Sequence, residues 1–192
     1  MTVIIQPHQG ILFMKVGVHA NESLEDIIAR KTLEIKQAGF ALWGYGGNTC
    51  HPATMVQPFA QHHASVGGKI FLCMQEMESH HFADPVRAEQ YSSDDINWQP
   101  VPDAINVLGS RFALAIKDLR QEKFILPLDK TKVAVGKSAG RLGNKYIAGR
   151  VDKACLDITD QIGIQSEEGE STEIQISLVA ELCEPYAVFL KN

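Results

Sequence analysis

Short apolar runs separated by polar turns dominate the first 75 residues of the chain. Residues 11–18, 40–43 and 69–74 are largely apolar and have the length of strands. Runs of this kind, bounded by polar or glycine-containing segments, are typical of buried strands. We therefore expect three strands in this part of the molecule.

Between the first two of these strands the apolar positions follow a helical period. The residues that share one helical face are Leu24, Ile27, Ile28, Ile35 and Ala38. Asn21 or Ser23 can cap the start of this helix, acidic residues follow in its first turn, and Gly39 suits its end. Lys31 falls on the apolar face. Either its ammonium reaches the edge of the core, which we favour, or it points into a site.

Two further helices are indicated by their boundary residues. Pro52 suits the first position of a helix that runs to about residue 65, where Gly67 and Gly68 follow. A third helix is expected over residues 138–150, although three glycines weaken it. The remaining apolar runs predict strands at residues 112–116, 124–126, 132–135, 154–158, 173–182 and 186–190.

Many strands with about three helices, and no regular alternation after residue 75, favour an α+β fold. We expect a small mixed or antiparallel β-barrel flanked by these helices, in a single domain covering residues 1–192. Residues 79–102 read as an irregular insertion in this domain. Residues 166–171 read as a mobile acidic loop.

The composition is that of an ordinary soluble protein, with 45% hydrophobic and 21% charged residues. No apolar run reaches the roughly 18 residues of a membrane span, and the N-terminus lacks the features of a secretory signal. We therefore expect a cytoplasmic protein without a membrane partner. In that compartment the four cysteines are expected to be reduced thiols.

The net charge of -5 argues against strong nonspecific binding to nucleic acid, because that affinity comes mainly from neutralising phosphates. Residues 130–153 are an exception, with seven lysines and arginines against the single acid Asp152. Within this segment the expected helix start could bind phosphate. Its candidate phosphate-binding residues are Lys137, Ser138, Arg141 and Lys145. A solvated helix face explains the same pattern.

Residues 43–52 (WGYGGNTCHP) are the strongest candidate for a binding site. Their three glycines allow sharp bends and close approach of a ligand to the main chain. Trp43 and Tyr45 could stack on a planar base, while Asn48, Thr49 and His51 hydrogen-bond to its edge. The alternative is that Trp43 fills the core and the glycines only form a tight turn.

Catalytic and metal-binding interpretations of the same region are weaker. Cys50 could act as a nucleophile at the start of the helix led by Pro52, with His51 as its base. Five histidines lie between residues 51 and 81, yet none of them forms a spacing typical of metal ligands. No metal or cofactor is therefore expected.

Three features together resemble the start of EVE domains, in the PUA-like superfamily that also includes ASCH domains. They are the run Phe13-Met14-Lys15-Val16, the helix after residues 22–26, and the turn that begins at Trp43. The resemblance implies a small mixed barrel that binds RNA or a flipped or modified nucleobase. It implies Trp43 and Asn48 as pocket residues. The glycines of the turn replace the Arg-Asn pair of EVE domains, and residues 79–102 have no counterpart there.

These observations predict a binding module for a nucleobase, a nucleotide or nucleic acid, without an enzymatic step. The alternative is a hydrolase or transferase that acts on a nucleotide-like or amide substrate through Cys50 and His51. A third hypothesis is a toxin, antitoxin or phage-defence component that acts through protein contacts. Only the acidic loop at residues 166–171 supports it.

Overall fold

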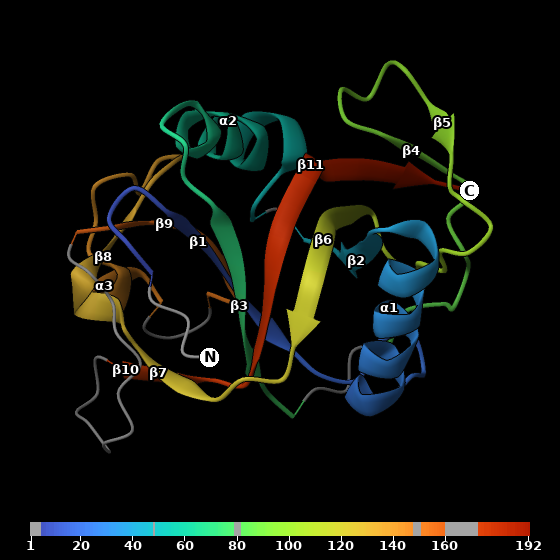
Figure 1. The fold of residues 1–192 in the computed structure, drawn as a ribbon, viewed down its shortest axis with the longest axis horizontal. Coiled ribbons are helices and arrows are strands. Elements are labelled where there is room, and N and C mark those ends of the chain that lie inside the picture. Colours follow the sequence, from blue (N-terminus) through green and yellow to red (C-terminus); the bar gives the residue numbers. More distant parts are fainter. Residues whose placement is uncertain (1–4, 48, 79–81, 148–150, 160–172) are drawn as a thin grey trace.

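The computed structural model of the chain describes residues 5–47, 49–78, 82–147, 151–159 and 173–192. It is an α+β fold, as the sequence predicts (Figure 1). The helical segments are α1 (Leu24–Ala38), η1 (Pro52–Val56), α2 (Gln57–Ser65), η2 (Leu128–Lys130) and α3 (Gly143–Tyr146). The strands are β1 (Gly10–Val16), β2 (Ala41–Tyr45), β3 (Ile70–Glu76), β4 (Gln90–Ser92), β5 (Gln99–Pro100), β6 (Phe112–Arg120), β7 (Phe124–Pro127), β8 (Thr131–Val133), β9 (Lys153–Ile158), β10 (Glu173–Ile176) and β11 (Leu178–Lys191).

Within the described residues, nine strands form one open sheet. The main path is β2-β6-β11-β3-β1-β9-β8, and β4 and β5 extend it beside the C-terminal half of β11. β1 pairs in parallel with β3, whereas its other neighbour, β9, is antiparallel. Strands β7 and β10 pair separately. The sheet does not close, so the predicted small barrel is wrong. Of the two strand arrangements left open by the sequence, mixed or antiparallel, the sheet is mixed.

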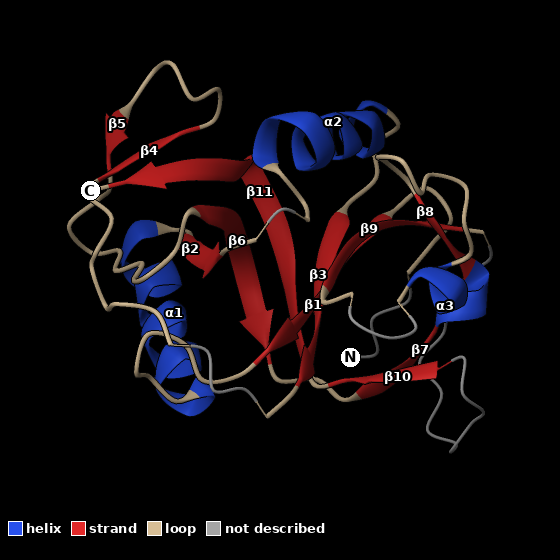
Figure 2. Ribbon diagram, turned by 180° about the vertical axis from the view of Figure 1, so that it is seen from behind, coloured by secondary structure: helices blue, strands red, loops and turns tan. Residues whose placement is uncertain are grey.

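The long strand β11 belongs to two parts of the sheet, one beside β3 and one beside β4. Its pairing with β6 shifts register between Val179 and Glu181 and again between Leu182 and Ala187. Its first part pairs with β3, and its last part pairs with β4. Irregular pairing of this kind bends a strand and increases its twist. Figures 1 and 2 show β11 turning from the middle of the sheet toward β4 and β5.

The core divides between the two faces of the sheet. On one face a single cluster runs from Trp43 in β2 to Cys155 in β9 and takes in the apolar sides of α1 and α2. On the other face a second cluster lies between β1, β9 and the β7–β10 pair. A third cluster lies between β6, the end of β11 and residues 101–107. Figure 2 shows α1 and the β7–β10 pair at opposite sides of the molecule.

The first two predicted helices are present with their predicted boundaries. The Ser23 hydroxyl accepts a hydrogen bond from the Asp26 amide (3.1 Å), and Gly39 ends α1 at φ 85°. After Pro52 the chain forms one turn of π-helix, η1, before it continues as α2.

The predicted helix over residues 138–150 is largely wrong. Only Gly143–Tyr146 is helical, and residues 148–150 lie outside the described part of the chain. Gly136 and Gly140 adopt φ values of 81° and 86°, which belong to turns and not to a right-handed helix. The glycines therefore prevail over the helical pattern of the other residues. Among residues 79–102, where an irregular insertion was predicted, the described part carries β4 and β5. The predicted acidic loop at residues 166–171 lies outside the described residues.

His63 holds α2 against the sheet and should make stability depend on pH. Its ring bonds to the Asp157 carboxylate of β9 (2.9 Å) and to the His8 carbonyl (3.2 Å). Burial alone lowers the pKa of His63, but the Asp157 and His8 hydrogen bonds and the Asp157 charge outweigh it, so the pKa is raised. A raised pKa stabilises the fold below the unfolded-state value of about 6.5, and this contribution disappears as pH rises through the folded-state pKa.

We therefore expect Asp157→Asn to lower the free energy of unfolding by about 1 kcal/mol at pH 5.5, because half-exposed ion pairs contribute modestly. At about pH 8.5 the two proteins should be nearly equal in stability. Urea unfolding at both pH values measures this difference. His62→Gln is the matched control, since it replaces the exposed neighbouring histidine and leaves the His63–Asp157 hydrogen bond in place. A loss of stability in Asp157→Asn that is the same at both pH values would contradict the role of His63.

Candidate functional site

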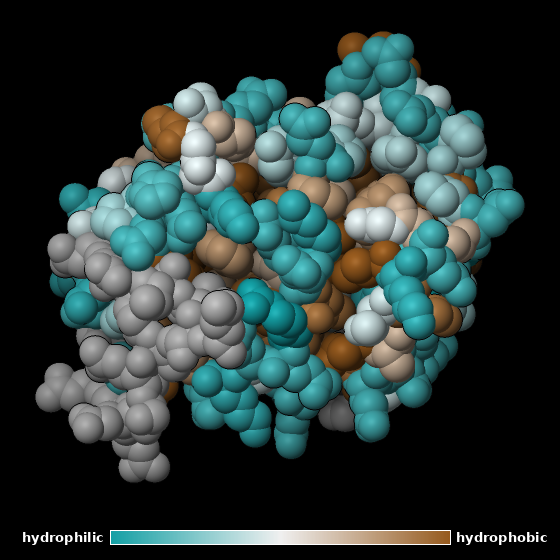
Figure 3. Space-filling view, viewed as in Figure 1, coloured by the Kyte–Doolittle hydropathy of each residue, from teal (hydrophilic) through white to brown (hydrophobic). Residues whose placement is uncertain are grey.

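A cavity of about 330 Å³ lies between β1, β2, α1 and the segment that precedes β6. Apolar side chains make up much of its wall, namely Met14, Val16, Ile27, Trp43, Met77, Val107 and Leu108. The charged residues along it are Lys15, Arg30, Lys31, Asp152 and Lys153. Figure 3 shows hydrophobic residues gathered over the region of α1, β2 and β6, surrounded by hydrophilic ones. The cavity is therefore lined by apolar side chains together with charged residues that are mainly cationic.

Trp43 and Tyr45 both line the cavity and both belong to the core. They are two positions apart on β2 and so lie on the same face of the sheet, with 5% and 3% of their surface exposed. The Tyr45 hydroxyl donates to the Cys50 carbonyl (2.6 Å), and its ring is tilted against Phe112. Burial raises the pKa of Tyr45, so its phenol stays neutral. Trp43 and Tyr45 are thus core residues that also border the cavity.

The three glycines that follow Trp43 differ in what the structure requires of them. A Cβ on Gly44 would lie 2.2 Å from the Ser110 hydroxyl oxygen and 3.0 Å from Val107, so Gly44 allows the segment before β6 to approach β2 closely. Gly47 has a φ of 84°. Gly46 has neither constraint, since a Cβ there would have no neighbour within 4 Å. Gly46 and Gly47 also line the cavity and leave their backbone open to a ligand.

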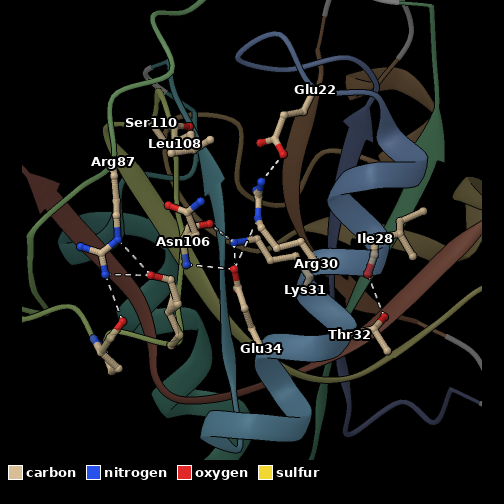
Figure 4. Close-up of polar contacts among 12 residues, drawn as sticks. Glu22, Ile28, Arg30, Lys31, Thr32, Glu34, Arg87, Asn106, Leu108 and Ser110 are labelled. Atoms are coloured by element: carbon tan, nitrogen blue, oxygen red, sulfur yellow. Dashed lines mark hydrogen bonds and ion pairs between the residues drawn. The ribbon is translucent and has the colours of Figure 1, made fainter.

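A buried polar network connects α1 to the opposite wall of the cavity (Figure 4). The Lys31 ammonium donates to the Glu34 carboxylate (3.0 Å) and to the Asn106 carbonyl (2.8 Å). Glu34 in turn accepts from the Asn106 amide (2.9 Å). Arg30 forms an ion pair with Glu22 and lies 3.4 Å from Glu34. The segment that carries Val107 and Leu108 is thus tied to α1 by both partners of a buried ion pair.

Lys31 occupies the position that the sequence analysis considered less favoured. Only 2% of its surface is exposed, so its ammonium does not reach solvent at the edge of the core. Burial lowers its pKa to about 8, although Glu34 acts in the opposite direction. Lys31 lines the cavity, while its ammonium is bonded to Glu34 and Asn106, which do not line it.

The other residues predicted to hold a base lie elsewhere or cannot be placed. Asn48 lies outside the described residues. Thr49 and His51 do not line the cavity. The His51 ring lies edge-on to Phe112 (5.5 Å) and Phe189 (5.0 Å), and its buried Nδ1 has no hydrogen-bond partner within the described structure.

The four predicted phosphate-binding residues do not line the cavity either. Lys137, Arg141 and Lys145 are exposed, and Ser138 lies in a turn instead of capping a helix. The cations of the cavity are Lys15, Arg30, Lys31 and Lys153. Of these, Lys15 belongs to the run that resembles EVE domains, and Lys31 interrupts an apolar helix face. These two signals could have identified them, whereas nothing in the sequence singles out Arg30 or Lys153.

The surroundings of Cys50 do not favour a nucleophile. Its surface is 2% exposed, and its Sγ lies 3.9 Å from the Sγ of Cys155. The hydrogen bond with Cys50, burial and the nearby charges of Cys50 and Asp157 raise the pKa of Cys155. Neither thiol is therefore in the exposed, electropositive setting that produces a reactive thiolate.

Two further properties concern the described part of the chain as a whole. No group of three or more His, Cys, Asp or Glu side chains in it is arranged to hold a metal ion. None of its helices is both long and apolar enough to span a lipid bilayer.

No protein-family model, curated protein or solved structure matches this chain.

Proposed function

We propose that this protein binds a nucleobase or nucleotide, free or within nucleic acid, in the cavity beside Trp43, without an enzymatic step. The observation that carries the proposal is the combination of an indole on the wall of a cavity with cations among the residues that line it. A planar base could lie against the indole, and stacking of this kind contributes roughly 1–3 kcal/mol. A cavity of about 330 Å³ is at the lower end of small-ligand pockets, as suits a single base.

The charge of the cavity supports an anionic or acceptor-rich ligand. Lys15, Arg30, Lys31 and Lys153 line it against the single carboxylate of Asp152, although the whole chain carries a net charge of -5. Glu22 and Glu34 offset part of this charge from behind Arg30 and Lys31. The local balance stays positive by one charge, four cations against three carboxylates. A phosphate or an electron-rich base edge would be attracted to such a site.

The exposed basic turn is a proposed contact for the backbone of a longer nucleic acid. It contains Lys137 and Arg141 and is followed by Lys145 in α3, and at Gly136 a Cβ would lie 3.6 Å from the end of Met55 in η1. The turn is thus close to the segment that follows the glycine turn. Kinship with PUA-like domains is part of the same proposal. Its support is the sequence pattern through β1, α1 and the turn, together with the position of Trp43 on the cavity wall.

Replacing Trp43 by alanine should weaken binding by about 5- to 150-fold, which is the stacking energy expressed as an affinity ratio. The measurement is fluorescence anisotropy with labelled oligonucleotides, carrying modified or unmodified bases, and competition by nucleoside monophosphates. Trp98→Ala is the matched control, because Trp98 is the only other tryptophan and its ring contacts Lys191 away from the cavity. Equal binding by the wild type and Trp43→Ala, or no binding by either, would count against the proposal.

A further inference from the structure

We infer that Lys31 donates a hydrogen bond to the exocyclic oxygen of the bound base, so that the cavity prefers oxo-bases over the corresponding amino-bases. Oxo-base here means a base with an oxygen at C6 of a purine or C4 of a pyrimidine, as in hypoxanthine and uracil, whereas adenine and cytosine carry an amine at that position. The inference rests on the proposed function, since it names the class of base that the same cavity takes.

The Lys31 ammonium has more N–H groups than the hydrogen bonds it donates in the structure. An ammonium carries three N–H groups and has no acceptor. Two acceptors surround it, the Glu34 carboxylate at 3.0 Å and the Asn106 carbonyl at 2.8 Å (Figure 4). Because Lys31 is buried and also lines the cavity, the cavity is where a third acceptor can approach.

This ammonium is also held in place before any ligand arrives. Glu34 bonds to Lys31 through one oxygen and to the Asn106 amide through the other (2.9 Å). Asn106 therefore meets both members of the ion pair, with its carbonyl toward Lys31 and its amide toward Glu34. A donor fixed on both sides loses little conformational freedom when it binds a ligand.

The side chains beside Lys31 on the cavity wall also bear on this preference. Arg30 and Lys153 are donors without acceptor capacity. The carboxylate of Asp152 lies 3.8 Å from the Lys15 ammonium. An exocyclic amine turned toward Lys31 would place its own N–H donor against an N–H donor of the Lys31 ammonium. Leaving such a group buried and unpaired costs about 1–3 kcal/mol.

The test compares nucleotides that differ in this exocyclic group and in the protonation of the ring nitrogen next to it. Isothermal titration calorimetry of the wild type should show inosine monophosphate binding about 5- to 150-fold more tightly than adenosine monophosphate, and uridine monophosphate more tightly than cytidine monophosphate, by a similar factor. Lys31→Met should remove the preference. The double variant Lys31→Met/Glu34→Gln should remove it too, while it avoids an unpaired buried carboxylate and keeps an acceptor for the Asn106 amide. Circular dichroism establishes that each variant is folded.

The possible outcomes separate this inference from the proposed function. Binding of all four nucleotides with equal affinity to the wild type would overturn the inference alone, and so would a preference that persists in the double variant. Absence of binding by any of the four would overturn the proposed function and the inference with it. A preference in the wild type that disappears in the folded double variant would support both.

Discussion

Replacing Glu34 by alanine should lower the free energy of unfolding by about 3–5 kcal/mol, as expected when one partner of a buried ion pair is removed. Glu34 is buried and accepts hydrogen bonds from Lys31 and from the Asn106 amide. Its loss leaves the Lys31 ammonium without a counter-charge in a site where 2% of the residue is exposed. The desolvation of that ammonium is then no longer compensated. Urea unfolding followed by circular dichroism measures the change.

Two further variants make this prediction specific. Glu25→Ala removes a carboxylate from the exposed first turn of the same helix and should cost less than about 1 kcal/mol. Adding Lys31→Met to Glu34→Ala removes the orphaned charge and should recover part of the lost stability. A loss in Glu34→Ala no larger than that in Glu25→Ala would mean that the buried pair contributes nothing.

The parts of the fold that the sequence predicts well are those determined by neighbouring residues. Helix α1 was predicted with both ends, because Ser23 caps it and Gly39 ends it within the same stretch of chain. The strand predicted over residues 40–43 is present, although β2 runs from Ala41 to Tyr45 and so includes a residue expected in the glycine turn. Signals of this kind act over a few residues and can be interpreted without knowledge of the tertiary structure.

The cavity could not be predicted in this way, because its walls are distant in sequence. Lys31 bonds to a carbonyl 75 positions away, and Gly44 approaches Ser110 across 66 positions. The sequence predicts the phosphate-binding cations at and near a helix over residues 138–150, but Gly136 and Gly140, with positive φ, form turns there instead. The prediction also assumed that residues adjacent to Trp43 along the chain surround the same ligand. Thr49 and His51 follow the turn but lie away from the cavity.

The sequence could not predict that the sheet is open, for a similar reason. A run of strands with few helices fits a barrel and an open, bent sheet equally well, because closure depends on which strands pair at the edges. Here β2 and β8 end the main path without pairing to each other. The space between β1, β2 and α1 is closed instead by side chains and by the segment before β6, and the cavity lies there.

Replacing Gly44 by alanine should be almost as damaging as removing Glu34, at about 3 kcal/mol, the upper end of the overpacking range. The added Cβ would lie 2.2 Å from the Ser110 hydroxyl oxygen and 2.8 Å from the Ser110 Cβ, so this segment has to move. Val107 and Leu108 precede Ser110 and line the cavity, and their displacement should also weaken ligand binding. Thermal unfolding and the anisotropy titration measure the two effects.

Gly46→Ala is the matched control for this prediction, because a Cβ there has no neighbour within 4 Å and the φ of Gly46 is not among the positive values. It should change stability by less than about 1 kcal/mol, as for other glycines in a permitted conformation. Combining Gly44→Ala with Ser110→Gly removes the two closest clashing atoms and should restore part of the stability and of the binding. Equal stability of Gly44→Ala and Gly46→Ala would show that the wall before β6 does not depend on close contact with β2. The shape of the cavity would then need another cause.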